Sequence, residues 1–414
     1  MSLFSRVSYV PVLTLAMLVM MLRPLLMARI FDASGFGVYS LGLLISSSFC
    51  ILGCIGLYPM LQRSMPMDIV KGREKAAAIL MIQCGLLALL CLLLGLLIPF
   101  AGIRVVDLSD RGFAVSLLHG FSQQLFLVAT VESRSRGEPL RFAIQNLLRA
   151  LVIFGAGWLV AIQYQSVTLT LLAEAVIALV MAAGIIHHAV SRSRLQIAIL
   201  CRLAIKRLGR LPWKSAIALL GGALVGFVLT NADRWIAASL FPHAMFAVYA
   251  FAWIILAVSQ SIQAIISSSL FPAMARDYAS NGVRSSFRMA SMWGLGLILI
   301  GLVGLWPATV VTIWAIREWF AGYVSANPII PLFYLLAIIR VSDFWTGFLI
   351  VAGRERAVMN INIFVAIAGL LLLVGYSMHQ TGASVGLLGL AGFACLLSFL
   401  RQIIIVIYSF GAAR

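Results

Sequence analysis

Charge is scarce in this chain, and acidic residues are scarcest: 13 of its 414 residues are Asp or Glu, against 30 that are Lys or Arg. Charged residues make up 10% of the sequence, and no long polar region remains from which a soluble domain could fold. A P-loop pattern is also missing, which argues against an ATP-driven pump with its own nucleotide-binding domain. These absences exclude the ordinary soluble enzyme classes.

The six cysteines are few and poorly placed for chemistry. Five fall in long apolar segments, and Cys201 falls in a polar connection. None stands at metal-ligand spacing from a histidine, and none falls in a predicted outer loop. We therefore expect no metal, no cofactor and no disulfide framework.

Hydrophobic residues are abundant, at 63% of the chain. They form runs of about 20 residues, the length that crosses a bilayer. Twelve runs predict twelve transmembrane helices, at approximately 8–28, 37–62, 76–99, 112–130, 142–163, 168–189, 215–240, 244–270, 289–314, 329–352, 358–378 and 383–409. The first run holds Arg23 and Pro24 and shows no small-residue cleavage site, so we interpret it as a retained span. The predicted fold class is an all-α polytopic membrane protein.

Basic residues are unevenly divided among the predicted loops. With the N-terminus in the cytoplasm, cytoplasmic segments hold 21 of the 30 Lys and Arg residues, the spans hold five, and the outer loops hold four. The outer four are Arg29, Arg104, Arg111 and Arg317. Because basic loops stay on the cytoplasmic side, we expect both termini there. The net charge of +17 mainly reflects this asymmetry and does not point to nucleic acid.

The longest polar connection, 190–214, divides the chain into two sets of six spans. We expect residues 1–190 to form an N-terminal six-helix lobe, 191–214 a basic linker, and 215–414 a C-terminal six-helix lobe. In the linker, Arg202, Lys206 and Arg210 recur every four residues with Leu and Ile between them. This pattern suits an amphipathic helix on the anionic cytoplasmic leaflet. A linker that only fixes the topology fits equally well.

A weak internal repeat relates the two halves. A shift of 210 residues aligns 28–39 with 238–249, with five identities in twelve positions. Because each half has an even number of spans, both enter the membrane in the same direction, and the repeat is parallel. We expect two lobes around a central cleft. The same shift places Arg23 in register with Asp233, so we expect these two to face each other across the cleft.

Five arginines fall inside predicted spans: Arg23, Arg149, Arg234, Arg340 and Arg401. A cation in lipid costs roughly 2.5–3.5 kcal/mol on insertion scales, so such residues normally face a bundle interior or a water-filled cavity. The planar guanidinium donates two hydrogen bonds at once and suits phosphate. We interpret the five, together with Asn231, as a path that binds an anionic head group such as a diphosphate. Separate helix-packing ion pairs are the alternative.

Three acids are embedded in the spans: Glu174, Asp233 and Asp343. Each is a candidate for coupling transport to a proton or sodium ion. Holding an arginine in place explains each equally well. Asp233 and Arg234 are adjacent and point about 100° apart on a helix, so each needs another partner. Arg340 and Asp343 are three apart on one face, a spacing that allows them to pair locally.

A polar stripe marks the fourth span, where His119, Ser122 and Gln123 are spaced three and four apart. A histidine in such a place is more often hydrogen-bonded packing than a proton relay.

Two stretches together resemble bacterial polysaccharide flippases of the O-antigen repeat-unit type, within the multidrug/oligosaccharidyl-lipid/polysaccharide export superfamily. Residues 28–41 and 53–57 resemble their first hairpin. Residues 231–234, with Tyr249-Ala250 and Phe271-Pro272, resemble their seventh and eighth spans. The chain departs from the family pattern at 241–244, Phe-Pro-His-Ala, where a small acidic or glycine turn is usual.

The resemblance implies a twelve-helix, two-lobed transporter of the bacterial inner membrane. It implies alternating access that moves undecaprenyl-diphosphate-linked oligosaccharide for lipopolysaccharide and related polysaccharides to the outer leaflet. The drive would be an ion gradient or the membrane potential, and polysaccharide-assembly proteins are expected partners.

Two other functions remain open. A drug/cation antiporter of the same superfamily would line its cleft with acids and aromatic residues, and five arginines against three acids disfavour it. An integral-membrane polymerase or glycosyltransferase would need a large outer loop or a metal-binding acidic motif. The only close acid pair outside is Asp107 and Asp110, in a short loop. We therefore expect a protein that is not an enzyme.

Overall fold

The structure is a computed structural model that describes residues 9–101, 107–192, 196–379 and 386–413. Every regular element in these ranges is a helix. Arg104, one of the four basic residues of the predicted outer loops, lies outside the described residues. The all-α prediction is confirmed.

Twelve helical segments are long and apolar enough to cross a membrane, within the part of the chain that is described. They are α2 (Tyr9–Ile30), α3 (Ala33–Leu52), α5 (Glu74–Leu96), α6 (Asp110–Ser135), α7 (Pro139–Tyr164), α8 (Val167–Arg192), α10 (Trp213–Leu240), α11 (His243–Asn281), α12 (Val283–Trp319), α13 (Ile330–Val341) with α14 (Trp345–Val351), α15 (Glu355–His379) and α16 (Leu387–Ala413). The chain is a multi-pass membrane protein, as predicted.

Shorter helices connect the long ones. They are α4 (Leu57–Val70), α9 (Ile197–Lys206) and the 3-10 turns η1 (Pro99–Ala101), η2 (Leu208–Arg210) and η3 (Ala321–Ala326). Side-chain caps start two of the spans. Asp32 accepts a hydrogen bond from the backbone N–H of Gly35 at 2.9 Å, and Ser109 accepts one from Gly112 at 3.1 Å. Each cap satisfies a donor that the first helical turn leaves free.

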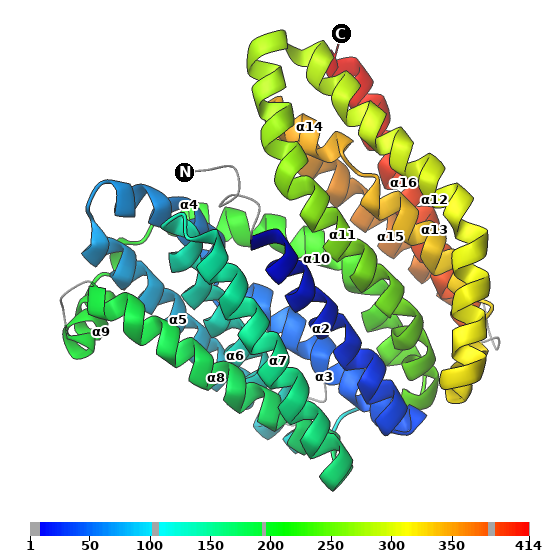
Figure 1. Ribbon diagram of the computed structural model, residues 1–414, viewed down its shortest axis with the longest axis horizontal. Helices are drawn as coiled ribbons and strands as arrows, with labels where there is room; N and C mark the ends of the chain where they lie inside the picture. The colour runs from blue at the N-terminus through cyan, green and yellow to red at the C-terminus, as the bar shows by residue number, and fades with distance from the viewer. Residues whose placement is uncertain (1–8, 102–106, 193–195, 380–385, 414) are drawn as a thin grey trace. The chain divides into compact units, whose positions relative to one another are not determined.

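The chain divides into two compact units, Met1–Phe227 (unit 1) and Val228–Arg414 (unit 2), and the division falls inside α10. In unit 1, α2 packs on α7, and α6 packs on α3 and α8 (Figure 1). In unit 2, α13 packs on α11, α12 and α16, and α15 packs on α16. The lobe boundaries at 190 and 215 stay a prediction.

The repeat positions lie in the core of each unit. Phe36 and Tyr39 are fully buried in unit 1, and Phe246 and Tyr249, 210 residues later, are fully buried in unit 2. The same aromatic residue types therefore occupy equivalent buried positions near the start of α3 in unit 1 and of α11 in unit 2.

One predicted span ends earlier than expected. The apolar run 37–62 is interrupted after Leu52, where α3 ends, and α4 begins only at Leu57. Between them Ile55 and Gly56 take left-handed backbone angles, φ 46° and 77°. A left-handed pair cannot continue an α-helix, so the chain turns there.

Other boundaries also differ from the prediction. Helices α11 and α12 have 39 and 37 residues and extend well beyond the predicted spans 244–270 and 289–314. The predicted span 329–352 is broken between Val341 and Trp345. Asp343 lies in this break, so it is not held on the regular face of a helix.

Gly56 provides a direct test of the turn after α3. A Cβ added there would lie 1.9 Å from the backbone oxygen of Ala216, and its φ is left-handed. Gly72 is also left-handed, at φ 69°, but a Cβ there meets nothing within 4 Å. We expect Gly72→Ala to cost about 1 kcal/mol of stability from backbone strain alone, and Gly56→Ala to cost several-fold more. Thermal unfolding of the purified variants measures both; equal losses would contradict the contact with Ala216.

Candidate functional site

Glu174 is the centre of a buried polar cluster in unit 1. It is fully buried on α8, and three side chains from three other helices reach its carboxylate. Arg23 Nη1 on α2 donates to Oε2 at 3.1 Å, and Tyr39 Oη on α3 donates to Oε1 at 3.0 Å. Gly157 on α7 leaves room for the carboxylate, because a Cβ there would lie 2.8 Å from Oε1. The acid thus holds an arginine in place.

His119 extends this cluster into α6. Its Nε2 lies 3.3 Å from Glu174 Oε2, and its Nδ1 lies 2.8 Å from the hydroxyl of Ser46. Gln123 Nε2 lies 3.4 Å from the same Nε2. The polar stripe predicted for this span therefore faces a carboxylate. Sequence reasoning found the stripe but not its partner, because Glu174 is 55 residues further along the chain.

Arg149 has a different environment. Its guanidinium lies over the Phe126 ring, 4.4 Å from the centroid, and its Nε is buried without a hydrogen-bond partner. Within the described residues it forms no ion pair. A cation over an aromatic face gains some stabilisation, but the ring does not neutralise its charge.

In unit 2 the acid and the cation of α10 take separate partners. Asp233 accepts a hydrogen bond from Tyr249 Oη at 2.8 Å. Arg234 lies over the Trp253 ring, 4.2 Å from the centroid, and donates to Asn231 Oδ1 at 3.4 Å. The prediction that neighbours in sequence need different partners is confirmed for both. The Arg23–Asp233 pairing stays a prediction.

The local pair of Arg340 with Asp343 that the spacing allows is not formed. Asp343 instead pairs with Arg401 on α16, whose Nη1 lies 2.7 Å from Oδ2. Both carboxylate oxygens also accept from Thr346 Oγ1, at 2.7 and 2.8 Å. The break between α13 and α14 turns the acid away from the i,i+3 geometry that the sequence implied. Arg340 donates to the backbone oxygen of Thr230 at 3.4 Å.

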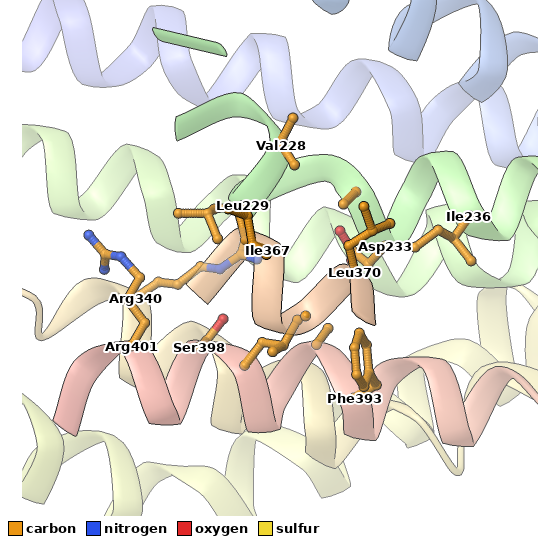
Figure 2. A pocket seen from close by; sticks show the side chains of 15 residues that line it. Val228, Leu229, Asp233, Ile236, Arg340, Ile367, Leu370, Phe393, Ser398 and Arg401 are labelled. Carbon is orange, nitrogen blue, oxygen red and sulfur yellow. The ribbon is translucent and has the colours of Figure 1, made fainter. Parts of the chain in front are cut away.

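Three of these residues, Asp233, Arg340 and Arg401, line a pocket of about 250 Å³ in unit 2. Its charged side chains are Asp233, Arg340 and Arg401, and most of the others are apolar. The lining comes from α10, α13, α15 and α16. Figure 2 shows Arg340 and Arg401 near one end of the pocket, and Asp233 and Phe393 toward the other. An amphiphile with an anionic head fits this polarity.

A second charged cluster, which sequence reasoning missed, lies at the ends of α6, α7 and α8. Buried Glu132 pairs with Arg136, Arg141 and Arg192, and Arg136 also pairs with Glu74. A hydrogen bond from Arg141 lowers the pKa of Glu138 beside it. The available signals were the i,i+4 spacing of Glu132 and Arg136 and the i,i+3 spacing of Glu138 and Arg141. Every acid here has a basic partner, so we assign the cluster to helix packing.

The described residues contain no group of three His, Cys, Asp or Glu side chains that could hold a metal ion. The cysteines in the described part of the chain are free thiols, and Cys54 Sγ accepts a hydrogen bond from Gln124 Nε2 at 2.9 Å.

The Arg23–Glu174 pair can be tested by a double-mutant cycle. Arg23→Met leaves a buried carboxylate without its cation, which we expect to cost about 3–5 kcal/mol. Adding Glu174→Gln removes the stranded charge and should restore part of the loss. Arg149→Met is the matched control, because Arg149 has no ion pair to break, and its cost should be smaller. Thermal unfolding in detergent measures the wild type, Arg23→Met, Glu174→Gln, the double variant and the Arg149→Met control. The pair is not the stabilising contact if the double variant is no more stable than Arg23→Met.

No protein-family model matches this sequence, and no curated protein sequence matches it. Solved structures do match. The lipid II flippase MurJ in an inward closed conformation has a TM-score of 0.66 at 10% identity, covering 97% of this chain and 87% of MurJ. An inward-facing multidrug resistance MATE family transporter of the MOP superfamily has a TM-score of 0.66 at 13% identity, covering 97% and 94%. A Vibrio cholerae MATE transporter has a TM-score of 0.62 at 14% identity, covering 98% and 95%. The chain therefore has the fold of MOP superfamily transporters.

Proposed function

We propose that this protein is a flippase that moves undecaprenyl-diphosphate-linked oligosaccharide across the bacterial inner membrane by alternating access, with both termini in the cytoplasm. The observation that carries the proposal is the apolar pocket of unit 2, with Arg340 and Arg401 at one end. Two guanidinium groups suit a diphosphate, and apolar walls suit the start of a lipid chain.

The size of the pocket limits what it would hold. Its volume of about 250 Å³ is below the roughly 300–1,000 Å³ of typical ligand pockets. An oligosaccharide would not fit. We therefore assign the pocket to the diphosphate and the adjacent lipid, and leave the sugar outside it.

The balance of buried charge supports an anionic cargo. Of the five arginines in the spans, Arg23 and Arg401 have carboxylate partners. Within the described residues, Arg149 forms no ion pair, and Arg234 and Arg340 lie in the field of Asp233 without forming a salt bridge with it. An unneutralised cation inside a membrane protein is costly, and a bound phosphate would offset that cost. Arg340 is the one of these three that lines the pocket, so we rank it first among the binding residues.

The drug/cation antiporter remains the second candidate. One observation favours it, because Asp233 lines the same pocket and a carboxylate can receive a cationic drug. Transporters and a flippase both occur among the structural neighbours. The two functions predict opposite charge on the cargo, so they can be separated by experiment.

Among the three acids, Asp233 is the best placed for ion coupling. Glu174 and Asp343 are each held by an arginine and by further donors. Asp233 pairs with the neutral Tyr249 hydroxyl and faces the pocket, from which a proton or sodium ion can reach it. We therefore propose Asp233 as the coupling site, and Glu174 and Asp343 as residues that position arginines.

The cargo can be tested by the leaflet in which the lipid-linked sugar accumulates. In cells depleted of the protein, undecaprenyl-diphosphate oligosaccharide should accumulate on the cytoplasmic side, and the wild type should restore transfer. Arg340→Ala and Arg401→Ala should each lower the rate at least about tenfold, because each removes hydrogen bonds to a charged group. Arg284→Ala and Arg288→Ala, at exposed arginines of α12, are the matched controls and should transport normally.

Two outcomes would contradict the flippase. In one, depletion leaves the lipid-linked sugar evenly accessible. In the other, depletion sensitises cells to cationic drugs and Asp233→Asn alone abolishes resistance, which supports the antiporter.

The coupling role of Asp233 predicts a separate phenotype. Asp233→Asn keeps an oxygen that accepts from Tyr249 but removes the charge. We expect transport by this variant to become independent of the ion gradient, measured as an equal rate before and after an ionophore collapses it. Glu318→Gln, at an exposed acid of α12, is the control and should keep the wild-type dependence. If transport by the Asp233→Asn variant still falls when the ion gradient is collapsed, Asp233 is not the coupling residue.

A further inference from the structure

Helix α9 lies on the connection between two membrane-length helices. α8 ends at Arg192 and α10 begins at Trp213. Because consecutive spans leave and re-enter the bilayer on the same side, the connection stays at one membrane surface. Figure 1 shows α9 next to the end of α8. Trp213 opens α10, a residue type enriched at membrane–water interfaces.

One face of α9 is fixed to the protein. Leu200 and Ala204 are fully buried. Gln83 Nε2 on α5 donates a hydrogen bond to the backbone oxygen of Ala204 at 3.1 Å. The buried apolar side chains and this hydrogen bond together hold the helix against the protein. This anchoring sets which residues point outward.

The opposite face mixes apolar and basic side chains. Ile199 and Ile205 are 45% and 59% exposed. Arg202 and Lys206 are exposed on the same face, and the exposed Arg207 and Arg210 follow. None of these four cations forms an ion pair with another described residue, and the sequence contains no acid from 196 to 232. A face used only as a solvated linker has no need of two exposed isoleucines.

We propose that this outer face of α9, with Arg207 and Arg210, is a binding surface for anionic phospholipid head groups. The cations attract the anionic leaflet, and the isoleucines enter the boundary between head groups and acyl chains. Each basic residue near an anionic surface is worth about a fivefold preference. None of these residues lines the transport pocket, so the proposal does not depend on which cargo the protein carries.

Hydrogen–deuterium exchange of the full-length protein in lipid nanodiscs tests the surface locally. Backbone amides of 197–210 should exchange more slowly in discs with phosphatidylglycerol than in discs of pure phosphatidylcholine. The quadruple variant Arg202→Gln, Lys206→Gln, Arg207→Gln, Arg210→Gln should lose this difference. Ile199→Ser with Ile205→Ser should reduce it while the charge is intact. Unchanged exchange of α5 around Gln83 checks that α9 is still docked.

The matched control removes the same charge elsewhere. Arg284, Arg288, Arg354 and Arg356 are also exposed, and replacing all four by Gln should leave the α9 difference intact. A charge-conserving variant, Arg202→Lys with Arg207→Lys and Arg210→Lys, should also keep it. If the quadruple α9 variant does not fold, the pair Arg202→Gln, Lys206→Gln makes the same test with half the charge change.

Three results would overturn the proposal. The first is equal exchange of α9 in the two kinds of disc. The second is the same slowing in phosphatidylcholine discs when inorganic phosphate is added, which would indicate a site for a soluble anion. The third is loss of the difference in the control variant, which would indicate a general effect of net charge. None of these measurements depends on transport, so failure here leaves the flippase proposal untouched.

Discussion

The cost of placing a guanidinium inside an apolar helix bundle governs the polar architecture of this protein. Each such group costs roughly 2.5–3.5 kcal/mol on insertion scales unless something compensates it. Unit 1 compensates Arg23 with Glu174, and unit 2 compensates Arg401 with Asp343. Arg149 and Arg234 have aromatic faces in place of carboxylates. The positive charge that remains without a carboxylate partner is the basis of our proposal that the cargo is anionic.

Each unit contains a buried carboxylate that accepts a hydrogen bond from a tyrosine hydroxyl, but the carboxylate comes from a different position in each unit. Tyr39 and Tyr249 occupy equivalent repeat positions, and each donates its hydroxyl to a buried carboxylate. In unit 1 that carboxylate comes from α8, and the position equivalent to Asp233 is Arg23. In unit 2 the carboxylate is Asp233 itself, and it faces a pocket. The acid of unit 1 is therefore enclosed by its partners, whereas the acid of unit 2 lines a pocket.

The sequence predicts the fold well because its signal is repeated. Twelve apolar runs of bilayer length leave little freedom in fold class, and all twelve appear as helices. Interruptions were harder to predict. The turn at Ile55 and Gly56 lies inside an unbroken apolar run, and hydropathy does not register a left-handed backbone. The break at Asp343 also lies inside a predicted span, but it contains polar residues and no left-handed backbone, so nothing in the local sequence marked it as a helix end.

Side-chain partners were predictable only in part. The neighbours Asp233 and Arg234 point apart because helical geometry requires it, and the sequence shows that directly. The partners of Glu174 come from α2, α3 and α6, so no spacing along the chain could reveal them. Spacing was misleading for Arg340 and Asp343, because the helix that would have aligned them ends between them. Local rules hold where a helix is continuous and fail where tertiary contacts decide.

The most direct test of the account uses the purified protein in sealed proteoliposomes. A polyprenyl-diphosphate-linked sugar is placed in both leaflets, and a membrane-impermeant glycosidase is added outside. We expect the protein to speed the exposure of the inner pool, and free inorganic diphosphate, which would compete for the arginines, to slow it. If the inner pool stays protected while the same vesicles exchange a lipophilic cation, the cargo is a cation and the account is wrong.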